Sequence, residues 1–371
     1  MRDKEFFLTY PRRRLIRSTL ITFAKAFLAL LTRTEVKGME RLPKKGPIIL
    51  AGNHVAEFEA VLMASFTPGQ VEFIGTGDIP LDPNYAFFAN AYGIIPVNRG
   101  NLDRKGLYMS LDVLRQGGIL GIFPEGGTWD PAHMQAQPGV AWLSYKAQAP
   151  VLPIGFGGMS GSLQAVLKRQ RPQMTMRVGK PIPPVTLPDN GRSIKYNLEY
   201  AAEQILSEIN GLIPANERVK VNDRLDEVYQ LEVKVLSEQW ALEIPTEYQL
   251  QHGAAYARVL FNPTIMDVLY RNLNLPIQAL KEVNSRIKPD SLLKAWQAIL
   301  NYLEINPGFF TYRFGVQTGL AVKEALQELH RLGQWALNQD YGLVINPIRS
   351  YRNAATGNRV TEQGGRFPGS M

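Results

Sequence analysis

"GPIILAGNHVAEFEAVLMASF", residues 46–66, reads as a buried strand followed by a helix. The apolar run at 48–51 is short and bounded by glycines, as in a strand that is buried on both faces. From about residue 58 to residue 66 the pattern is helical. His54 therefore follows the carboxyl end of a strand, which is where ligands bind in an α/β sheet.

Short apolar strands and helical patterns alternate over the next 150 or so residues, roughly one domain's length. Strands are expected at "VEFIG" (71–75), "GIIPV" (93–97), "GILGIFP" (118–124), "VLPIGF" (151–156) and "MTMRVG" (174–179), and helices near 103–116, 138–148 and 193–213. Asn101 or Asp103 can cap one of these helices and Gly117 can end it. This alternation predicts an α/β fold with a mixed, largely parallel sheet covered by helices on both faces.

Composition limits the chemistry that this chain can carry. Its 371 residues predict about two folded units. The absence of cysteine excludes disulfides and thiolate catalysis, and with only four histidines no metal site is expected. The net charge of +8 favours an anionic partner. No basic stripe interleaved with aromatic residues appears, so nucleic acid is not the expected partner.

Residues 12–33, "RRRLIRSTLITFAKAFLALLTR", predict an amphipathic helix. Its apolar face is expected to contain Ile16, Leu20, Phe23, Phe27 and Leu30, and its polar face Arg14, Arg17, Ser18 and Lys25. Charge interrupts the apolar run before it reaches the roughly 20 residues that span a bilayer. We therefore expect the helix to lie on an anionic membrane surface; packing against the protein's own core is the alternative.

Three further segments end strands in the same way as "NHVAEFE" (53–59): "GIIPVNRG" (93–100), "FPEGGTW" (123–129) and "VLPIGFGG" (151–158). Together, in this order and at this spacing, they resemble the four sequence blocks of the glycerolipid acyltransferase superfamily. The resemblance covers roughly residues 35–215. It implies the fold of glycerol-3-phosphate acyltransferases and a largely parallel sheet.

The resemblance also implies roles for individual residues. In the first block His54 matches the catalytic base and Glu59 stands at the position of the family's aspartate, while Glu57 is a rival for orienting the histidine. Asn53, Arg99, Glu125 and Gly126 are the implied substrate-binding residues, with Arg99 on the acceptor's anion. Two cations of the family pattern are missing, because Trp129 and Gln137 stand where arginine and lysine are usual.

The implied reaction is direct acyl transfer to a hydroxyl of a lysophospholipid-type acceptor, as in 1-acylglycerol-3-phosphate O-acyltransferases. The donor is acyl-CoA or acyl carrier protein, acting as a co-substrate, and no cofactor is expected. The protein is expected to be a peripheral membrane protein at the cytoplasmic face, with roles in phospholipid biosynthesis. Two alternatives remain: an acyltransferase for an acceptor without a phosphomonoester, and a lipid-binding pseudoenzyme with the same fold.

Other enzyme classes match less well. "GMSGS" (158–162) lacks the last glycine of a nucleophile elbow, which argues against a serine hydrolase. No glycine-rich phosphate loop follows the first strand.

Four regions are predicted along the chain. They are a membrane-associated N-terminal helix (1–34), a catalytic domain (35–217), a second α+β domain of unknown role (218–350) and a disordered tail (351–371). In the second domain we expect strands at 228–236 and 342–348 and helices near 252–272, 289–304 and 317–339. The glycine-rich, polar composition of the tail is the basis for predicting disorder there.

Overall fold

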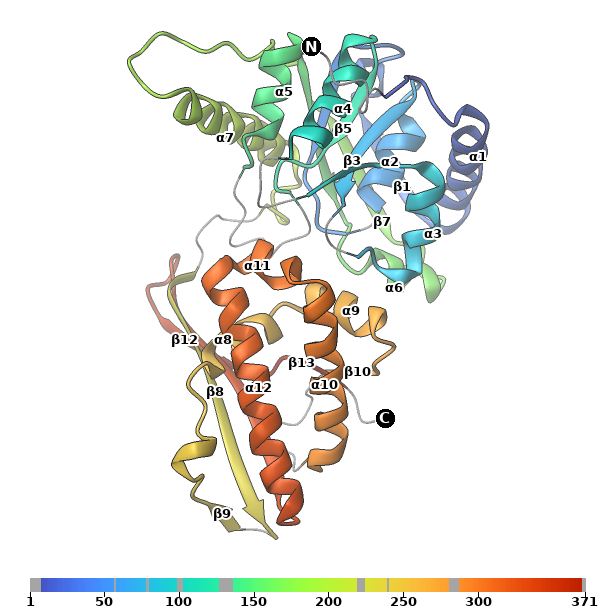
Figure 1. Ribbon diagram of the computed structural model, residues 1–371. Helices are drawn as coiled ribbons and strands as arrows, with labels where there is room; N and C mark the ends of the chain where they lie inside the picture. Colours follow the sequence, from blue (N-terminus) through green and yellow to red (C-terminus); the bar gives the residue numbers. More distant parts are fainter. Residues whose placement is uncertain are drawn as a thin grey trace. The chain divides into compact units, whose positions relative to one another are not determined.

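The computed structural model describes residues 8–56, 58–77, 80–98, 103–126, 136–218, 224–238, 240–279 and 287–368. The chain forms two compact units, which are described separately (Figure 1). The first comprises Met1–Gly77 and Phe87–Val221, and the second Asp78–Ala86 and Asn222–Met371.

A seven-stranded sheet forms the centre of the first unit, in the order β1-β7-β6-β2-β5-β3-β4. The strands are β1 (Arg33–Lys37), β2 (Ile48–Gly52), β3 (Val71–Thr76), β4 (Ile95–Val97), β5 (Ile119–Ile122), β6 (Val151–Gly157) and β7 (Gln173–Val178). Only β6 and β7 pair antiparallel, and the other neighbours are parallel. The predicted mixed, largely parallel sheet is confirmed. Strand β1 was not predicted, because its charged sequence "RTEVK" lacks a long apolar run.

Helices cover both faces of this sheet. They are α1 (Arg14–Leu31), α2 (Phe58–Phe66), α3 (Pro83–Tyr92), α4 (Arg104–Arg115), α5 (Gly139–Ala147), α6 (Ser162–Leu167) and α7 (Ile194–Leu212), and a 3-10 turn spans Met39–Arg41. Ile48 and Leu50 of β2 pack in the core that includes α1, α2 and α6. Ile49 and Ala51 pack in the core that includes α4, α5 and α7. Burial on both faces explains why β2 is a continuous apolar run.

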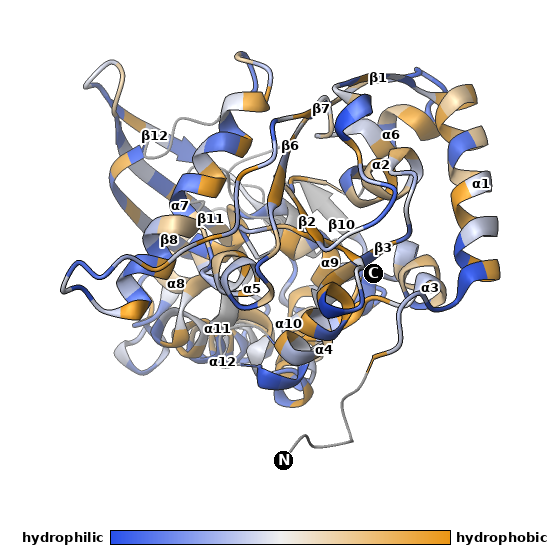
Figure 2. Ribbon diagram, turned by 90° about the horizontal axis from the view of Figure 1, so that it is seen from above, coloured by the Kyte–Doolittle hydropathy of each residue, from blue (hydrophilic) through white to orange (hydrophobic). Residues whose placement is uncertain are grey.

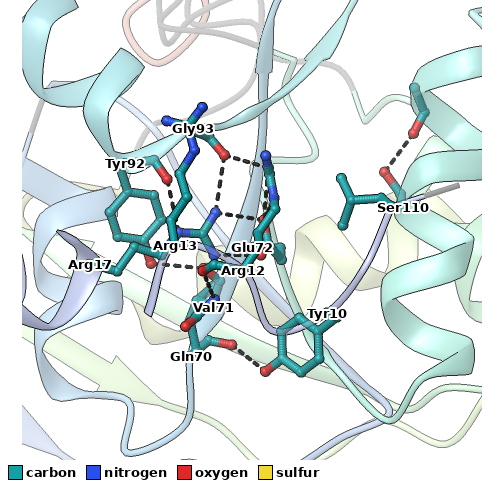
Figure 3. Close-up of polar contacts among 12 residues, drawn as sticks. Tyr10, Arg12, Arg13, Arg17, Gln70, Val71, Glu72, Tyr92, Gly93 and Ser110 are labelled. Carbon is teal, nitrogen blue, oxygen red and sulfur yellow. Dashed lines mark hydrogen bonds and ion pairs between the residues drawn. The ribbon is translucent and has the colours of Figure 1, made fainter. Parts of the chain in front are cut away.

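The N-terminal helix α1 leaves much of its predicted apolar face exposed. Phe23 and Leu30, on that face, are both 71% exposed. Arg17, which the sequence places on the polar face, is buried and ion-paired with Glu72 of β3 (Figure 3). The burial of Arg17 was not predicted. Helical periodicity predicts which residues share a face, but it does not predict which face is buried. Arg17 is buried because the buried carboxylate of Glu72 pairs with it.

The second unit combines an antiparallel sheet with helices, as predicted. Its main sheet has the order β12-β11-β8-β9. The strands are β8 (Arg224–Ser237), β9 (Trp240–Leu242), β10 (Ile277–Ala279), β11 (Gly342–Asn353), β12 (Arg359–Gln363) and β13 (Arg366–Pro368), with β10 paired to β13. The helices are α8 (Gly253–Leu260), α9 (Pro263–Asn272), α10 (Pro289–Ile305), α11 (Gly308–Phe314) and α12 (Val316–Asn338), and a 3-10 turn spans Thr246–Tyr248. Trp296 and Tyr256 are among the residues of its own buried core.

The predicted disordered tail is wrong as far as residue 368. Strand β12 pairs antiparallel with β11, and β13 pairs with β10. Arg349 Nε donates to Glu362 at 2.9 Å, and the Tyr351 hydroxyl donates to the same carboxylate at 2.9 Å. The glycine-rich stretches form turns between strands. Local composition does not predict cross-strand pairs of this kind, because the partner lies on another strand.

Candidate active site

His54 lies where β2 ends and before α2 begins. The preceding residue, Asn53, is buried and joins this strand end to β6: its Nδ2 donates to the Phe156 carbonyl at 3.2 Å, and the Phe156 N–H donates to its Oδ1 at 2.7 Å. These two bonds hold the backbone on which His54 is placed. Contact of Asn53 with a substrate stays a prediction.

Glu59 is fully buried in the first turn of α2 and faces the His54 ring. Its Oε1 accepts hydrogen bonds from the N–H groups of Val55 and Ala56, both at 2.8 Å. Its other oxygen, Oε2, lies 3.5 Å from His54 Nδ1. These two N–H groups, from residues just before α2, hold the carboxylate in place beside the His54 ring. The rival carboxylate, Glu57, lies outside the described residues.

The His54 ring is packed on one side and open on another. It stacks on the Phe123 ring, with centroids 4.2 Å apart and planes inclined by 20°, and its side chain is 24% exposed. A carboxylate beside Nδ1 favours the tautomer with the proton on that nitrogen, which leaves the lone pair of Nε2 free to accept a proton. This arrangement of groups can perform general base catalysis.

Glu125 joins the site from the adjacent strand, since it follows β5, the parallel neighbour of β2. Its Oε2 accepts a hydrogen bond from the His54 backbone N–H at 3.1 Å. Burial raises the pKa of Glu125 to about 8; the bond from His54 lowers it and the charge of Glu59 raises it. A carboxyl group with this pKa exists in both protonation states near neutral pH.

Gly126 completes a tight turn after β5. Its N–H donates to the Phe123 carbonyl at 2.9 Å, and its φ of 76° lies in the left-handed region that favours glycine. The turn carries Phe123 and Glu125 on the same short loop, so one backbone conformation supplies both the ring under His54 and the carboxyl beside it. Substrate contact by Gly126 stays a prediction.

The structure brings together five of the six predicted site residues: Asn53, His54, Glu59, Glu125 and Gly126. Arg99 and Trp129 lie outside the described residues. Gln137 is exposed, and its N–H donates to the Pro124 carbonyl at 2.8 Å, which places it beside the Glu125 turn. Among the described residues, no three His, Asp or Glu side chains are grouped so that they could hold a metal ion.

Phe123 was quoted in the third block but was given no function. The sequence could have indicated Phe123 only through its position directly after β5. In the fold, β5 pairs with β2, the strand before His54. Only the strand order makes these two ends neighbours.

A separate groove of about 780 Å³ lies in the second unit. It is lined by residues of α10 and α12, including Lys294, Gln297, His330 and Gln334, and none of its lining residues is a carboxylate. The groove therefore lacks a carboxylate that could orient His330 as Glu59 can orient His54. For this reason His54 stays the candidate general base.

Comparisons with known proteins find similarity over the first unit. Residues 33–157 match the family model described as Acyltransferase. The 1-acyl-sn-glycerol-3-phosphate acyltransferase of Bacillus subtilis (strain 168) is 22% identical over 159 residues, which are 43% of this chain and 78% of that protein. The crystal structure of PlsC, the 1-acyl-sn-glycerophosphate (LPA) acyltransferase from Thermotoga maritima, is 19% identical with a TM-score of 0.39, over 55% of this chain and 83% of that one.

The family match spans the segment that contains Asn53, His54, Glu59 and Glu125. These findings support an acyltransferase whose segment 33–157 is similar to the glycerolipid acyltransferases.

Proposed function

We propose that this acyltransferase moves a fatty acyl group from acyl-CoA or acyl carrier protein to a hydroxyl of a lysophospholipid-type acceptor. The observation that carries the proposal is the His54–Glu59 pair. A buried carboxylate, held by two backbone N–H groups, faces Nδ1 of a partly exposed histidine at the carboxyl end of β2. The curated relative named above acts on 1-acyl-sn-glycerol-3-phosphate, which supports an acceptor of this class.

In the proposed reaction, Nε2 of His54 takes the proton of the acceptor hydroxyl as its oxygen attacks the thioester carbonyl. The resulting tetrahedral intermediate collapses, the carbon–sulfur bond breaks, and the thiolate leaves and takes up the proton from His54. Glu59 stabilises the imidazolium that exists between these steps. No covalent acyl-enzyme forms.

The acceptor is the finer part of the proposal. A phosphate monoester carries close to two negative charges and is usually surrounded by several donors. Arg99 is the matched cation in the sequence blocks, while Gln137, beside the Glu125 turn, stands where a lysine is usual. This favours an acceptor with less charge than lysophosphatidate, such as a lysophosphodiester or a neutral lipid alcohol.

We also propose that the protein works at the cytoplasmic surface of an anionic membrane. Exposed apolar residues of α1, including Phe23 and Leu30, support this placement, as does the net charge of +8. None of the described helices has both the length and the apolar character needed to cross a bilayer.

A mass-spectrometric acceptor screen tests the proposed reaction. Purified protein is incubated with an acyl-CoA or acyl carrier protein donor and a panel of lysophospholipids and neutral lipid alcohols. We expect an acylated product with at least one hydroxyl lipid, formed at least about 100-fold more slowly by a folded His54→Ala variant. Product formation by that variant at the wild-type rate would remove the proposed mechanism.

A second assay decides the acceptor class by comparing kcat/KM for lysophosphatidate, a lysophosphodiester and an uncharged lipid alcohol. The double variant Trp129→Arg/Gln137→Lys is expected to gain activity toward lysophosphatidate. If the wild type prefers lysophosphatidate and the double variant does not improve on it, the phosphate is bound by other residues.

A further inference from the structure

Exposed apolar side chains occur on a second helix beside α1. Phe87 and Phe88 of α3 are 74% and 57% exposed, and their rings contact each other edge to face with centroids 5.6 Å apart. Aromatic side chains of this size are rarely left in water as a pair without a function. The sequence of α3, "PNYAFFANAY", contains no charged residue.

Arginines of the N-terminal segment bind the C-terminal end of α3 to the start of α1 (Figure 3). Arg13 Nη1 donates to the carbonyls of Asn90 and Ala91 at 2.6 and 3.0 Å, and Arg17 Nε donates to the Tyr92 carbonyl at 2.8 Å. These carbonyls carry the partial negative charge of a helix C-terminus, where cations are favourable. These bonds hold the C-terminal end of α3 against the start of α1.

A basic turn is attached to the other end of α1. Arg171, in the turn after α6, donates from Nη2 to the carbonyls of Ala29 and Thr32, both at 3.3 Å. The same turn exposes Lys168 and Arg169, and Leu167 before it is 76% exposed.

The backbone of this turn is in an uncommon conformation. Arg169 and Arg171 have φ values of 56° and 46°, in the left-handed region that arginine seldom adopts. Four consecutive residues, "KRQR" at 168–171, thus carry three positive charges on a conformationally constrained turn.

From this arrangement we infer that α1, Phe87–Phe88 and the basic turn 167–171 form one membrane-docking surface, whose partner is an anionic lipid bilayer. The inference rests on the membrane association proposed above and adds two anchors to it. A bilayer fits because it offers hydrocarbon for the exposed Phe and Leu side chains and anionic headgroups for the lysine and arginines. Neither α1 nor α3 contains an acidic residue that would oppose such a surface.

Figure 2 shows α1 and α3 at one side of the first unit, away from α5 and α7. The surface is also joined to the active site through packing. Phe27 of α1 and Phe58 of α2 have ring centroids 6.1 Å apart, and Phe58 directly precedes Glu59. Docking through this surface would hold the helix that carries Glu59 close to the bilayer that contains a lipid acceptor.

The test is vesicle co-sedimentation of the full chain with two lipid compositions, phosphatidylcholine alone and phosphatidylcholine with about one-third phosphatidylglycerol. Phe87→Ser/Phe88→Ser should weaken binding to both compositions by at least about tenfold, since partial burial of two aromatic rings is lost. Lys168→Glu/Arg169→Glu should weaken binding to the anionic vesicles by at least about 30-fold, from two charges near the surface. It should leave the weak binding to neutral vesicles unchanged.

Matched controls use the same changes elsewhere. Lys44→Glu/Lys45→Glu changes the net charge equally at exposed positions before β2, and Trp240→Ser removes an exposed aromatic residue in the second unit. Both should bind anionic vesicles as the wild type does. Thermal melting confirms that each variant is folded.

Three outcomes separate the possible failures. If the wild type binds no vesicles, the membrane association itself is wrong. If Phe23→Ser/Leu30→Ser releases the protein while the α3 and basic-turn variants bind normally, α1 is the whole anchor and the inference is overturned. If the phenylalanine variant instead changes the oligomeric state measured by light scattering, with vesicle binding intact, the surface binds protein.

Discussion

At the scale of single residues, the candidate site contains two carboxyl groups, Glu59 and Glu125, in different environments. Glu59 accepts two backbone hydrogen bonds from the residues just before α2. Glu125 is buried with a raised pKa of about 8, which favours its neutral form. A carboxyl group with a strongly raised pKa beside a histidine is typical of catalytic sites.

The first prediction concerns the His54–Glu59 pair. His54→Ala should lower kcat/KM by about 10²–10⁴, the usual contribution of a general base. Glu59→Gln should lower kcat with little change in KM, because the amide cannot stabilise an imidazolium. Steady-state kinetics provides both values, and circular dichroism provides the control for folding.

Glu57→Gln is the matched control for this pair, since it removes the same charge two residues away. A larger loss from Glu57→Gln than from Glu59→Gln would assign the orienting role to Glu57.

The second prediction concerns the pH dependence of stability. The pKa of Glu125 is raised from 4.5 to about 8, so the folded state holds a proton that the unfolded state releases. Between about pH 4.5 and pH 8 the contribution of Glu125 to stability should therefore fall as pH rises. Glu125→Gln, which stays neutral, should remove this decline and should be more stable than the wild type at pH 8–9.

The measurement is the free energy of unfolding from urea titrations at several pH values. An identical pH dependence in wild type and Glu125→Gln would contradict the raised pKa. Activity is measured separately, because the same substitution changes the carboxyl that bonds to His54.

At the scale of elements, α1 buries one face and leaves another exposed. Arg17 and Leu28 are buried in the first unit, whereas Phe23 and Leu30 are exposed. Removing the whole helix would therefore disrupt part of the core as well as remove the proposed membrane anchor. Surface substitutions separate the two effects, which is why the vesicle experiment uses them.

The third prediction is that Arg17→Ala destabilises the first unit by about 3–5 kcal/mol, because it leaves the Glu72 carboxylate buried with its closest partner removed. Arg12, which is partly exposed and donates from Nε to Glu72 at 3.1 Å, would compensate only in part. Urea denaturation followed by tryptophan fluorescence measures the loss.

Arg14→Ala, at an exposed position on the same helix, should change stability by no more than about 0.5 kcal/mol. The double variant Arg17→Met/Glu72→Gln should recover part of the loss, since no buried charge is then left unpaired. Equal losses from Arg17→Ala and Arg14→Ala would mean that the ion pair contributes nothing measurable.

At the scale of the whole molecule, each unit has its own core and an ion pair with a buried carboxylate. The first has Arg17 with Glu72, and the second has Arg271 Nε donating to Asp82 Oδ2 at 2.7 Å. Asp82 is buried, and it belongs to the second unit although the chain reaches it from β3 of the first. Domains with separate cores can unfold in separate steps.

The fourth prediction follows from this division. Scanning calorimetry should show two transitions, with Arg17→Ala lowering the temperature of one and Arg271→Ala lowering that of the other. The reason is that each substitution leaves a buried carboxylate unpaired in one unit only. If both variants lowered both transitions equally, the two units would unfold as one cooperative body.

Local sequence patterns predicted most of the elements of this protein and its candidate site residues. The run "GPIILAG" predicted a buried strand. Asp103 predicted the start of a helix, and its side chain does accept a hydrogen bond from the Gly106 N–H at 2.9 Å. The four short sequence blocks indicated His54, Glu59 and Glu125 as candidate site residues. These features depend on residues close in sequence, where periodicity, capping and turn chemistry act.

The contacts between these elements depend on the tertiary structure. It placed Phe123 against His54, turned Arg17 inward to Glu72, and made strands of residues that composition had described as a disordered tail. In each case the deciding partner is distant in the chain or on a neighbouring strand: Phe123 for His54, Glu72 for Arg17, and Arg349 for Glu362. The free energy of burying a charge or a ring depends on that partner, so no local pattern could contain it.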